Sequence, residues 1–199
     1  DLAGNSYAGS SDYDFTVVAP PSAIVDLYVG TFGRAPDEDG LQYWDNLHDT
    51  GVLTLAGIAS NMMMSSEARL RYPGGVSNEA LVRLLYDNLF DRAPDPEGLT
   101  YWVDQMDRGL MSREMSIAYI IGGARADTGD PIDAKVFNSR VFNSLDYLAD
   151  VAAGQKVFTQ AQAEDVVTEV DREDVVAAGE NMAIQLFGIS PSADNLPYA

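Results

Sequence analysis

Apolar residues recur along this chain at intervals of three and four, and one stretch with this pattern occurs twice. Residues 24–44 and residues 82–102 lie 58 positions apart and are identical at eleven of 21 positions. In each copy the first apolar residues stand at i, i+3, i+4, i+7 and i+8, a spacing that places side chains on one face of a helix. These residues are Ile24, Leu27, Tyr28, Thr31 and Phe32, matched by Val82, Leu85, Tyr86, Leu89 and Phe90. A long self-match at a fixed spacing predicts two equivalent helical units.

An Arg-Ala-Pro-Asp segment interrupts the helical pattern in both copies. Because proline disfavours helical backbone at the residue before it, we expect the first helix to end near Gly33 in one copy and near Asp91 in the other. Asp37 and Asp95 follow the prolines, and each is predicted to cap a second helix by accepting a hydrogen bond from its free amides. Pro96 supports this interpretation, since proline is favoured at the first position of a helix.

The second helix of each copy has an apolar face and a glycine in its first turn. The face is formed by Leu41, Trp44 and His48, matched by Leu99, Trp102 and Met106. Glycine destabilises a helix by roughly 1 kcal/mol relative to alanine, so Gly40 and Gly98 indicate that a backbone or an aromatic ring packs against that point. We expect Trp44 and Trp102 to occupy matching, largely buried sites, and His48 to be a partly buried structural histidine.

Arg34 and Arg92 occupy equivalent positions, directly after the first helix of each copy. We expect each arginine to bond the carbonyls that end this helix or to pair with a nearby carboxylate, and an anion site is the functional alternative. The predicted structural motif therefore consists of Arg34, Asp37, Gly40 and Trp44 in the first copy and Arg92, Asp95, Gly98 and Trp102 in the second.

The signature G/D-R-x-P-D-x-x-G-L-x-Y-W resembles a bacterial domain-of-unknown-function family of tandem helical repeats. Members of this family are found in secreted haemolysin-type (RTX) and surface-layer-associated proteins, and the helical hairpins are similar to phycobilisome linker domains. The resemblance is strong over residues 22–125 and weaker over residues 130–188. It implies an all-α repeat architecture and an extracellular or cell-surface location. The family offers no catalytic residues to carry over.

Breaks in the helical pattern divide the chain into an extension, two repeats, a C-terminal helical part and a tail. The segment Tyr72-Pro73-Gly74-Gly75 separates the repeats. The predicted boundaries are 1–21 for the N-terminal extension, 22–125 for the tandem repeats (22–75 and 77–125), 130–188 for the C-terminal helical subdomain and 189–199 for the coil tail. We expect an all-α fold, an elongated bundle of about eight or nine helices.

Charge and composition exclude several classes of partner and chemistry. Asp and Glu number 31 against 12 Lys and Arg, and the formal net charge of −19 disfavours nucleic acid and anionic membrane surfaces. The chain has no stretch of about 18 apolar residues, so we expect no membrane insertion. The absence of cysteine excludes disulfides, thiolate catalysis and cysteine metal sites.

The sequence contains no recognisable catalytic arrangement, so we expect no enzyme. It has one histidine, no nucleophile elbow and no glycine-rich phosphate loop. Calcium, which takes carboxylate and carbonyl oxygens from a flexible loop, is the candidate cofactor. Its candidate ligands are Asp127, Asp130 and Asp133, in the loop of residues 125–133.

Two functions agree with these observations. The first is a non-catalytic, exported structural or interaction module of a bacterial cell-surface or extracellular assembly, with protein partners or copies of itself. The alternative is a carbohydrate-binding module with a polysaccharide ligand, for which Tyr7, Tyr13, Tyr43 and Tyr101 are candidate stacking surfaces. Exposed, coplanar aromatic rings would favour the alternative, whereas burial of Tyr43 and Tyr101 would remove half of its support. A hydrolase ranks third.

Overall fold

The computed structural model describes residues 23–126 and 129–178, and these residues form helices and loops without a β-strand. The α-helices are α1 (Ala23–Phe32), α2 (Glu38–Asp49), α3 (Leu55–Met63), α4 (Ala68–Arg71), α5 (Asn78–Phe90), α6 (Pro96–Asp107), α7 (Ser116–Ala124), α8 (Pro131–Ala152) and α9 (Gln160–Thr168), with a short 3₁₀ helix, η1 (Arg113–Met115). Residues 172–178 are also helical. The all-α prediction is therefore confirmed. Within the described ranges, no helix combines the length and apolar character needed to cross a bilayer.

The two sequence repeats fold into matching helical units. Helices α2 and α6 begin and end at residues that are 58 positions apart, the spacing of the sequence repeat. The third helix of each unit also starts from an equivalent cap, Thr54 in the first unit and Ser112 in the second. The second unit begins this helix with the 3₁₀ turn η1 and continues as α7. The prediction of two equivalent helical units is therefore correct over these elements.

The first helix of each unit ends where the sequence predicted. Helix α1 ends at Phe32 and α5 ends at Phe90. Gly33 and Asp91 follow with φ angles of 64° and 55°, so the chain leaves both helices through a left-handed residue. This conformation is easy for glycine and uncommon for other residues, among which aspartate tolerates it better than most. The same bend is therefore made by different residues in the two units.

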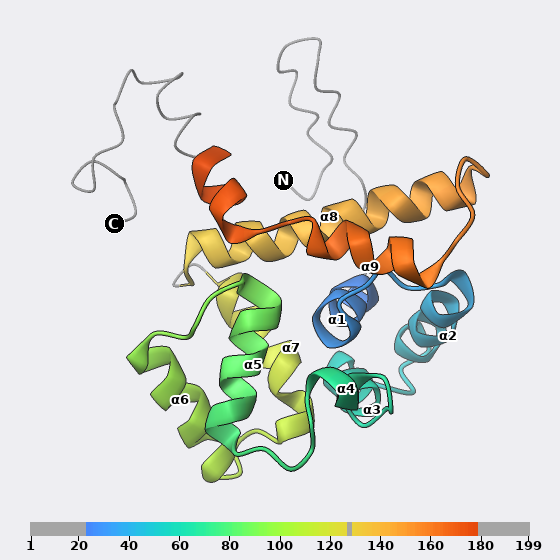
Figure 1. Ribbon diagram of the computed structural model, residues 1–199. Coiled ribbons are helices and arrows are strands. Elements are labelled where there is room, and N and C mark those ends of the chain that lie inside the picture. Colours follow the sequence, from blue (N-terminus) through green and yellow to red (C-terminus); the bar gives the residue numbers. More distant parts are fainter. Residues whose placement is uncertain (1–22, 127–128, 179–199) are drawn as a thin grey trace, which may run out of the picture.

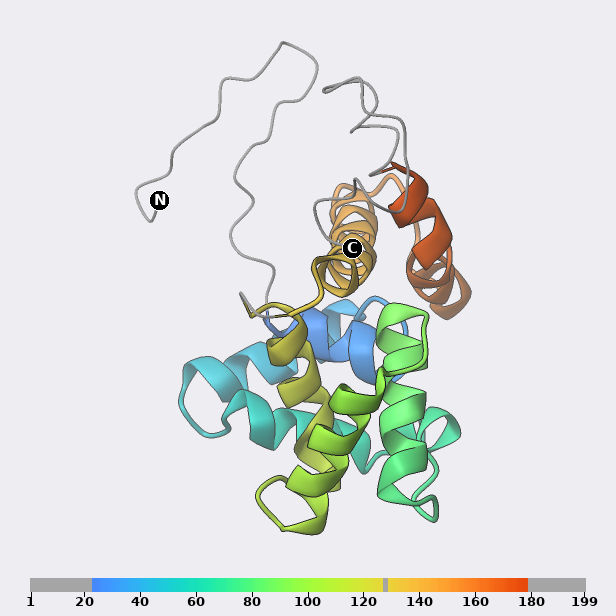
Figure 2. The ribbon, with the colours of Figure 1, turned by 90° about the vertical axis from the view of Figure 1, so that its left-hand side faces the viewer.

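Both units contribute to one hydrophobic core, to which α8 adds a third layer. Ile58 of the first unit and Leu85 of the second are fully buried in the same cluster as Phe137 of α8. Helix α8 lies across α1 and α5, and α9 packs alongside α8 (Figure 1). Figure 2 shows the same arrangement from the side, with α8 and α9 over one end of the repeat helices. The loop between the units, residues 73–75, is exposed.

Residues 62–64 are three consecutive methionines, and two of them lie in the core. Met62 and Met63 are buried, as are their second-unit counterparts Ile120 and Ile121. Met64 is instead half-exposed, because the helix ends at Met63. The predicted N-terminal extension (residues 1–21), the coil tail (189–199) and the last part of the C-terminal subdomain lie outside the described residues.

We predict that two phenylalanines of α8, five positions apart, differ sharply in their effect on stability. Phe137 is 1% exposed within the shared core, whereas Phe142 is 61% exposed. Phe137→Ala should lower the free energy of unfolding by about 3–5 kcal/mol, the usual cost of truncating a buried aromatic side chain. Phe142→Ala should change it by less than about 0.5 kcal/mol. Urea denaturation followed by circular dichroism measures both, and equal effects would contradict the placement of α8 on the core.

Candidate functional site

Each repeat turns a corner between its first two helices, and an arginine lies at the centre of that corner. The guanidinium of Arg34 lies over the ring of Tyr28, 5.2 Å from its centroid. Arg92 lies over the ring of Tyr86 in the second unit at 5.1 Å. Such cation–π contacts stabilise by about 0.5–1 kcal/mol at exposed sites and by more where water is excluded. The corner therefore fixes the arginine against the helix that precedes it.

A carboxylate from a later helix closes each corner. Arg34 donates from Nε to Glu67 at 2.7 Å and from the terminal nitrogen Nη2 at 3.3 Å. Arg92 makes the same two-point contact with Asp133, at 2.8 and 2.6 Å. The hydrogen bond to Asp133 raises the pKa of Arg92, so this side chain stays charged. Of the two structural roles expected for these arginines, the structure shows the pairing with a carboxylate.

The predicted helix caps are present in both units. Asp37 accepts a hydrogen bond from the amide of Gly40 at 2.8 Å, and Asp95 accepts one from Gly98 at 2.7 Å. The Gly98 amide is the largest cause that lowers the pKa of Asp95 below its usual value. Each cap carboxylate also lies 3.5 to 3.7 Å from the arginine of its corner. These two aspartates are therefore structural.

The glycines allow a tyrosine hydroxyl to reach the second helix. A Cβ atom built on Gly40 would lie 2.1 Å from the Tyr28 hydroxyl, and one built on Gly98 would lie 2.9 Å from the Tyr86 hydroxyl. The prediction that an aromatic side chain packs against both glycines is confirmed. Burial raises the pKa of Tyr28 to about 12, so its hydroxyl stays protonated at neutral pH.

The tryptophans occupy matching sites, as predicted, where both pack against the core and are partly buried. Trp102 donates from its indole nitrogen to the Tyr86 hydroxyl at 3.1 Å, and its ring lies against Gly123. In each unit the tryptophan meets the preceding tyrosine edge to face, with ring centroids 4.9 Å apart at Trp44 and 4.8 Å apart at Trp102. The indoles therefore cover the rim of the core, where their N–H groups find polar partners.

His48 is exposed, which corrects the prediction of a partly buried histidine. Its Nδ1 atom lies 3.4 Å from the Leu53 carbonyl oxygen. Met106, at the equivalent position of α6, is buried. The polar ring of His48 thus turns to solvent at a point where the second unit buries an apolar side chain.

One identical pair of the signature is exposed in both units. The structure describes all eleven identical pairs, and among them only Tyr43 and Tyr101 are exposed in both units, at 58% and 55%. Both tyrosines project from the second helix beside the tryptophan. The sequence alone could not separate them from the other aromatic residues of the signature, because helical spacing does not say which side chains remain uncovered.

Two of the three aspartates proposed as calcium ligands, Asp130 and Asp133, are engaged by protein donors. Asp130 caps α8 by accepting from the Ile132 amide at 2.7 Å, and Arg172 donates to it at 3.1 Å. Asp133, whose side chain is only 5% exposed, accepts from both Arg92 and Arg172. Asp127 lies outside the described residues. Among the residues that the structure does describe, no three acidic or histidine side chains are grouped so as to hold a metal ion. Calcium binding stays a prediction that no observation tests.

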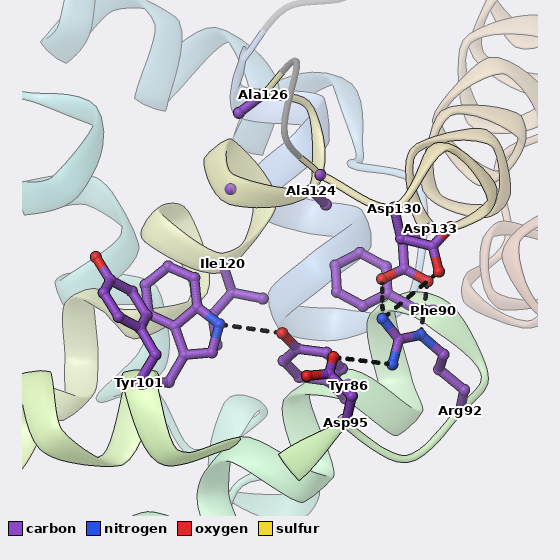
Figure 3. A pocket seen from close by; sticks show the side chains of 13 residues that line it. Tyr86, Phe90, Arg92, Asp95, Tyr101, Ile120, Ala124, Ala126, Asp130 and Asp133 are labelled. Atoms are coloured by element: carbon purple, nitrogen blue, oxygen red, sulfur yellow. Dashed lines mark hydrogen bonds and ion pairs between the residues drawn. The ribbon is translucent and has the colours of Figure 1, made fainter. Parts of the chain in front are cut away.

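A cavity of about 370 Å³ opens beside the corner of the second unit, between α5, α6, α7 and the start of α8. Its aromatic lining consists of Tyr86, Phe90, Tyr101 and Trp102. Its charged lining consists of Arg92, Asp95, Asp130 and Asp133. Figure 3 shows Tyr101 at one side of the cavity, Arg92 with Asp130 and Asp133 at the other, and Tyr86 between them. The size and the mixed lining are typical of small-molecule sites.

The second unit differs from the first in the chain that leads to its closing carboxylate. Arg34 and Glu67 are 33 residues apart, whereas Arg92 and Asp133 are 41 residues apart. The second connection is therefore eight residues longer. Ala126 and Gly129, which belong to it, line the cavity. The unit with the longer connection between its arginine and its closing carboxylate is thus the unit that has the cavity.

Some residues that contact the motif come from distant parts of the chain and could not be predicted from local sequence patterns. Glu67 and Arg172 were not predicted to contact it, and neither has a local pattern that marks it. Asp26 and Arg125, an ion pair between α1 and the end of α7, were missed for the same reason. Arg140 is buried and donates to two backbone carbonyls. Covariation between distant positions is the signal that could have found these pairs.

We predict that Gly40→Ala destabilises the protein because the new methyl group would collide with the Tyr28 hydroxyl, on a ring held edge to face by Phe32. The expected loss of unfolding free energy is about 1–3 kcal/mol, as for other overpacked sites. Gly122→Ala on α7 is the control, since its Cβ would meet nothing within 4 Å, and it should stabilise by up to about 1 kcal/mol. Adding Tyr28→Phe should recover part of the loss in the Gly40→Ala protein. Thermal denaturation would refute this prediction if Gly40→Ala melted at or above the wild-type temperature.

Comparison with known proteins identifies one region of similarity. Residues 59–121 match the model of a family described as "Domain of unknown function (DUF4214)". The matched region starts within α3, includes the whole second signature from Arg92 to Trp102 and ends within α7. No curated protein and no solved structure matches the chain. Residues 59–121 are thus similar to a family whose function is not known.

Proposed function

We propose that this chain is a non-catalytic, exported module that builds or decorates a bacterial cell-surface or extracellular assembly through protein contacts, including contacts with copies of itself. The observation that carries the proposal is the exposure of Tyr43 and Tyr101 at equivalent points of two units. The arginines, capping aspartates and glycines of the motif hold the two corners together. Tyr43 and Tyr101 are the identical residues that are exposed in both units.

Two exposed tyrosines on a repeated scaffold are suited to a protein interface. Tyrosine is enriched among the residues that dominate binding energy, because it offers a large rigid surface together with a polar tip. The units present the two rings in the same local setting, each edge to face with a tryptophan. A partner that is itself repeated could engage both rings, and linked contacts strengthen binding beyond either one alone.

The export and surface location rest on composition and on the family resemblance. A net charge of −19 with only two lysines, Lys135 and Lys156, suits salty or calcium-containing surroundings. Tandem repeats with this signature resemble those of secreted and surface-layer-associated proteins.

A carbohydrate-binding module is the second candidate, and the exposure of Tyr43 and Tyr101 favours it as well. Flat aromatic faces pack against the C–H groups of sugar rings, while neighbouring polar groups bond the hydroxyls. Tyr7 and Tyr13, the other two tyrosines proposed for this role, lie outside the described residues. The two candidates predict different effects of removing the tyrosines. An assembly module would lose association with protein, whereas a carbohydrate-binding module would lose binding to polysaccharide.

We expect the Tyr43→Ser, Tyr101→Ser double variant to lose assembly while keeping its fold. Sedimentation velocity over a wide concentration range, and co-sedimentation with envelope material from the exporting bacterium, measure association. The melting temperature should be unchanged, since both side chains are exposed. Tyr119→Ser, which removes another half-exposed tyrosine, is the matched control and should associate as the wild type does. A double variant that associates normally, or a wild type that binds neither itself nor envelope, would disprove the assembly proposal.

We further expect salt to stabilise the fold, and calcium chloride to do so more than sodium or magnesium chloride at equal ionic strength. Screening relieves the repulsion among 31 acidic residues with any salt, since the Debye length falls to about 10 Å at 0.1 M. A specific site adds RT ln(1 + [L]/Kd), about 2.7 kcal/mol at 100 times Kd. Asp130→Asn can still cap α8 but loses its ion pair with Arg172, so it should lower the melting temperature in every chloride and, in addition, abolish the extra gain in calcium chloride. Coincident melting curves in all three chlorides would leave screening alone and reject calcium binding.

A further inference from the structure

The cavity of the second unit combines an aromatic side with polar groups that have unused hydrogen-bonding capacity. The Tyr86 hydroxyl accepts from the Trp102 indole, but its own proton meets no acceptor among the described residues. The side chain of Asp95 is about half exposed; it accepts a hydrogen bond from the Gly98 amide at 2.7 Å and lies 3.7 Å from Arg92. A carboxylate has about four lone-pair sites, so Asp95 can accept further bonds. The cavity therefore offers one free donor and a free acceptor beside the aromatic rings.

The charges beside Tyr86 and Asp95 disfavour an ionic ligand on the aromatic side of the cavity. An anion would meet three carboxylates, and the arginine that could attract it, Arg92, is already paired with Asp133 at two points. A cation would seek an aromatic face beside a carboxylate, but Arg92 itself covers the Tyr86 ring at 5.1 Å and lies 3.7 Å from Asp95. Both favourable positions for a charge are therefore occupied by the protein's own ion pairs.

From this geometry we infer that the cavity binds one ring of a neutral sugar, with Tyr101 as the aromatic platform and Tyr86 and Asp95 as hydrogen-bonding partners of its hydroxyls. A pyranose has one face of C–H groups and a rim of hydroxyls that both donate and accept, which matches an aromatic side facing a polar side (Figure 3). Tyr101 is 55% exposed at the rim of the cavity, so adjoining sugar residues of a longer chain can extend to solvent. The inference rests on the carbohydrate-binding candidate and names its site and ligand class.

Tyr43 provides an internal control for Tyr101. Each tyrosine is more than half exposed, and each meets its tryptophan at an interplanar angle of 74°. Tyr101 lines the cavity, whereas Tyr43 is not among its lining residues. An effect of Tyr101→Ala that Tyr43→Ala does not reproduce must therefore come from the cavity and not from the loss of an exposed aromatic ring.

The two tryptophans make the site directly observable. The indole N–H of Trp102 bonds the cavity hydroxyl of Tyr86, and its ring lines the cavity. In a ¹⁵N-labelled protein the indole N–H groups give two signals, which Trp44→Phe assigns. Titration with neutral oligosaccharides of glucose, galactose, mannose and N-acetylglucosamine should shift the Trp102 signal in a saturable manner and leave the Trp44 signal in place.

Tyr101→Ala should weaken this binding at least tenfold, and Tyr43→Ala should leave the affinity unchanged. Asp95→Asn keeps the helix cap and should also weaken binding, with an unchanged melting temperature. Glucuronate and glucosamine oligomers, which are charged, should bind more weakly than their neutral counterparts. No saturable shift with any neutral sugar, equal effects of the two tyrosine variants, or preference for a charged oligomer would each overturn the inference. A failure of the protein to assemble would not overturn the inference about sugar binding, because assembly is measured separately by sedimentation.

Discussion

The fold depends on the pairing of one arginine in each unit with a carboxylate that arrives from a later helix. Arg34 and Arg92 each touch a tyrosine ring, a backbone carbonyl, a helix-capping aspartate and this carboxylate. The first three partners lie within six residues of the arginine, whereas the fourth ties the corner to the rest of the molecule. Because Asp133 is almost fully buried, its charge would be unstable there without the arginines that neutralise it. The start of α8 is thus fixed by the corner that it closes.

Local rules account for what could be predicted from the sequence. Helical spacing, the proline after Ala35, and the aspartate three residues before Gly40 act over a single turn of chain, so the helix ends and caps were found. The partners of Asp133 could not be found this way, because Arg92 and Arg172 are 41 and 39 residues from it. The cavity was missed because it depends on how α7 and α8 are connected. His48 was placed too deep because periodicity identifies a face without saying how fully another helix covers it.

The two units use the same corner for different purposes. Glu67 closes the first corner and leads into α4, a helix of four residues, whereas Asp133 lies in the first turn of α8, a helix of 22 residues. After the first corner is closed, the chain passes through α4 directly to α5. After the second corner is closed, the chain continues as α8, which packs across α1 and α5. The carboxylate that closes the corner can therefore belong to a short connection, as before α4, or to a long helix that covers the core, as in α8. Tyr43 and Tyr101 are similarly exposed in the two units, although the corners are closed by different elements. The surface proposed for a partner is therefore distinct from the contacts that hold the helices together.

The shared core has a consequence for how the polypeptide can be divided. Ile58, Leu85 and Phe137 pack in one cluster, although they come from opposite sides of the exposed loop at residues 73–75. A break of the backbone in this loop would remove no core contact, so the two fragments would remain associated as one body. Neither fragment alone could cover its own apolar surface. The protein is therefore a natural candidate for fragment complementation, in which two fragments that do not fold separately form the native structure when they are mixed.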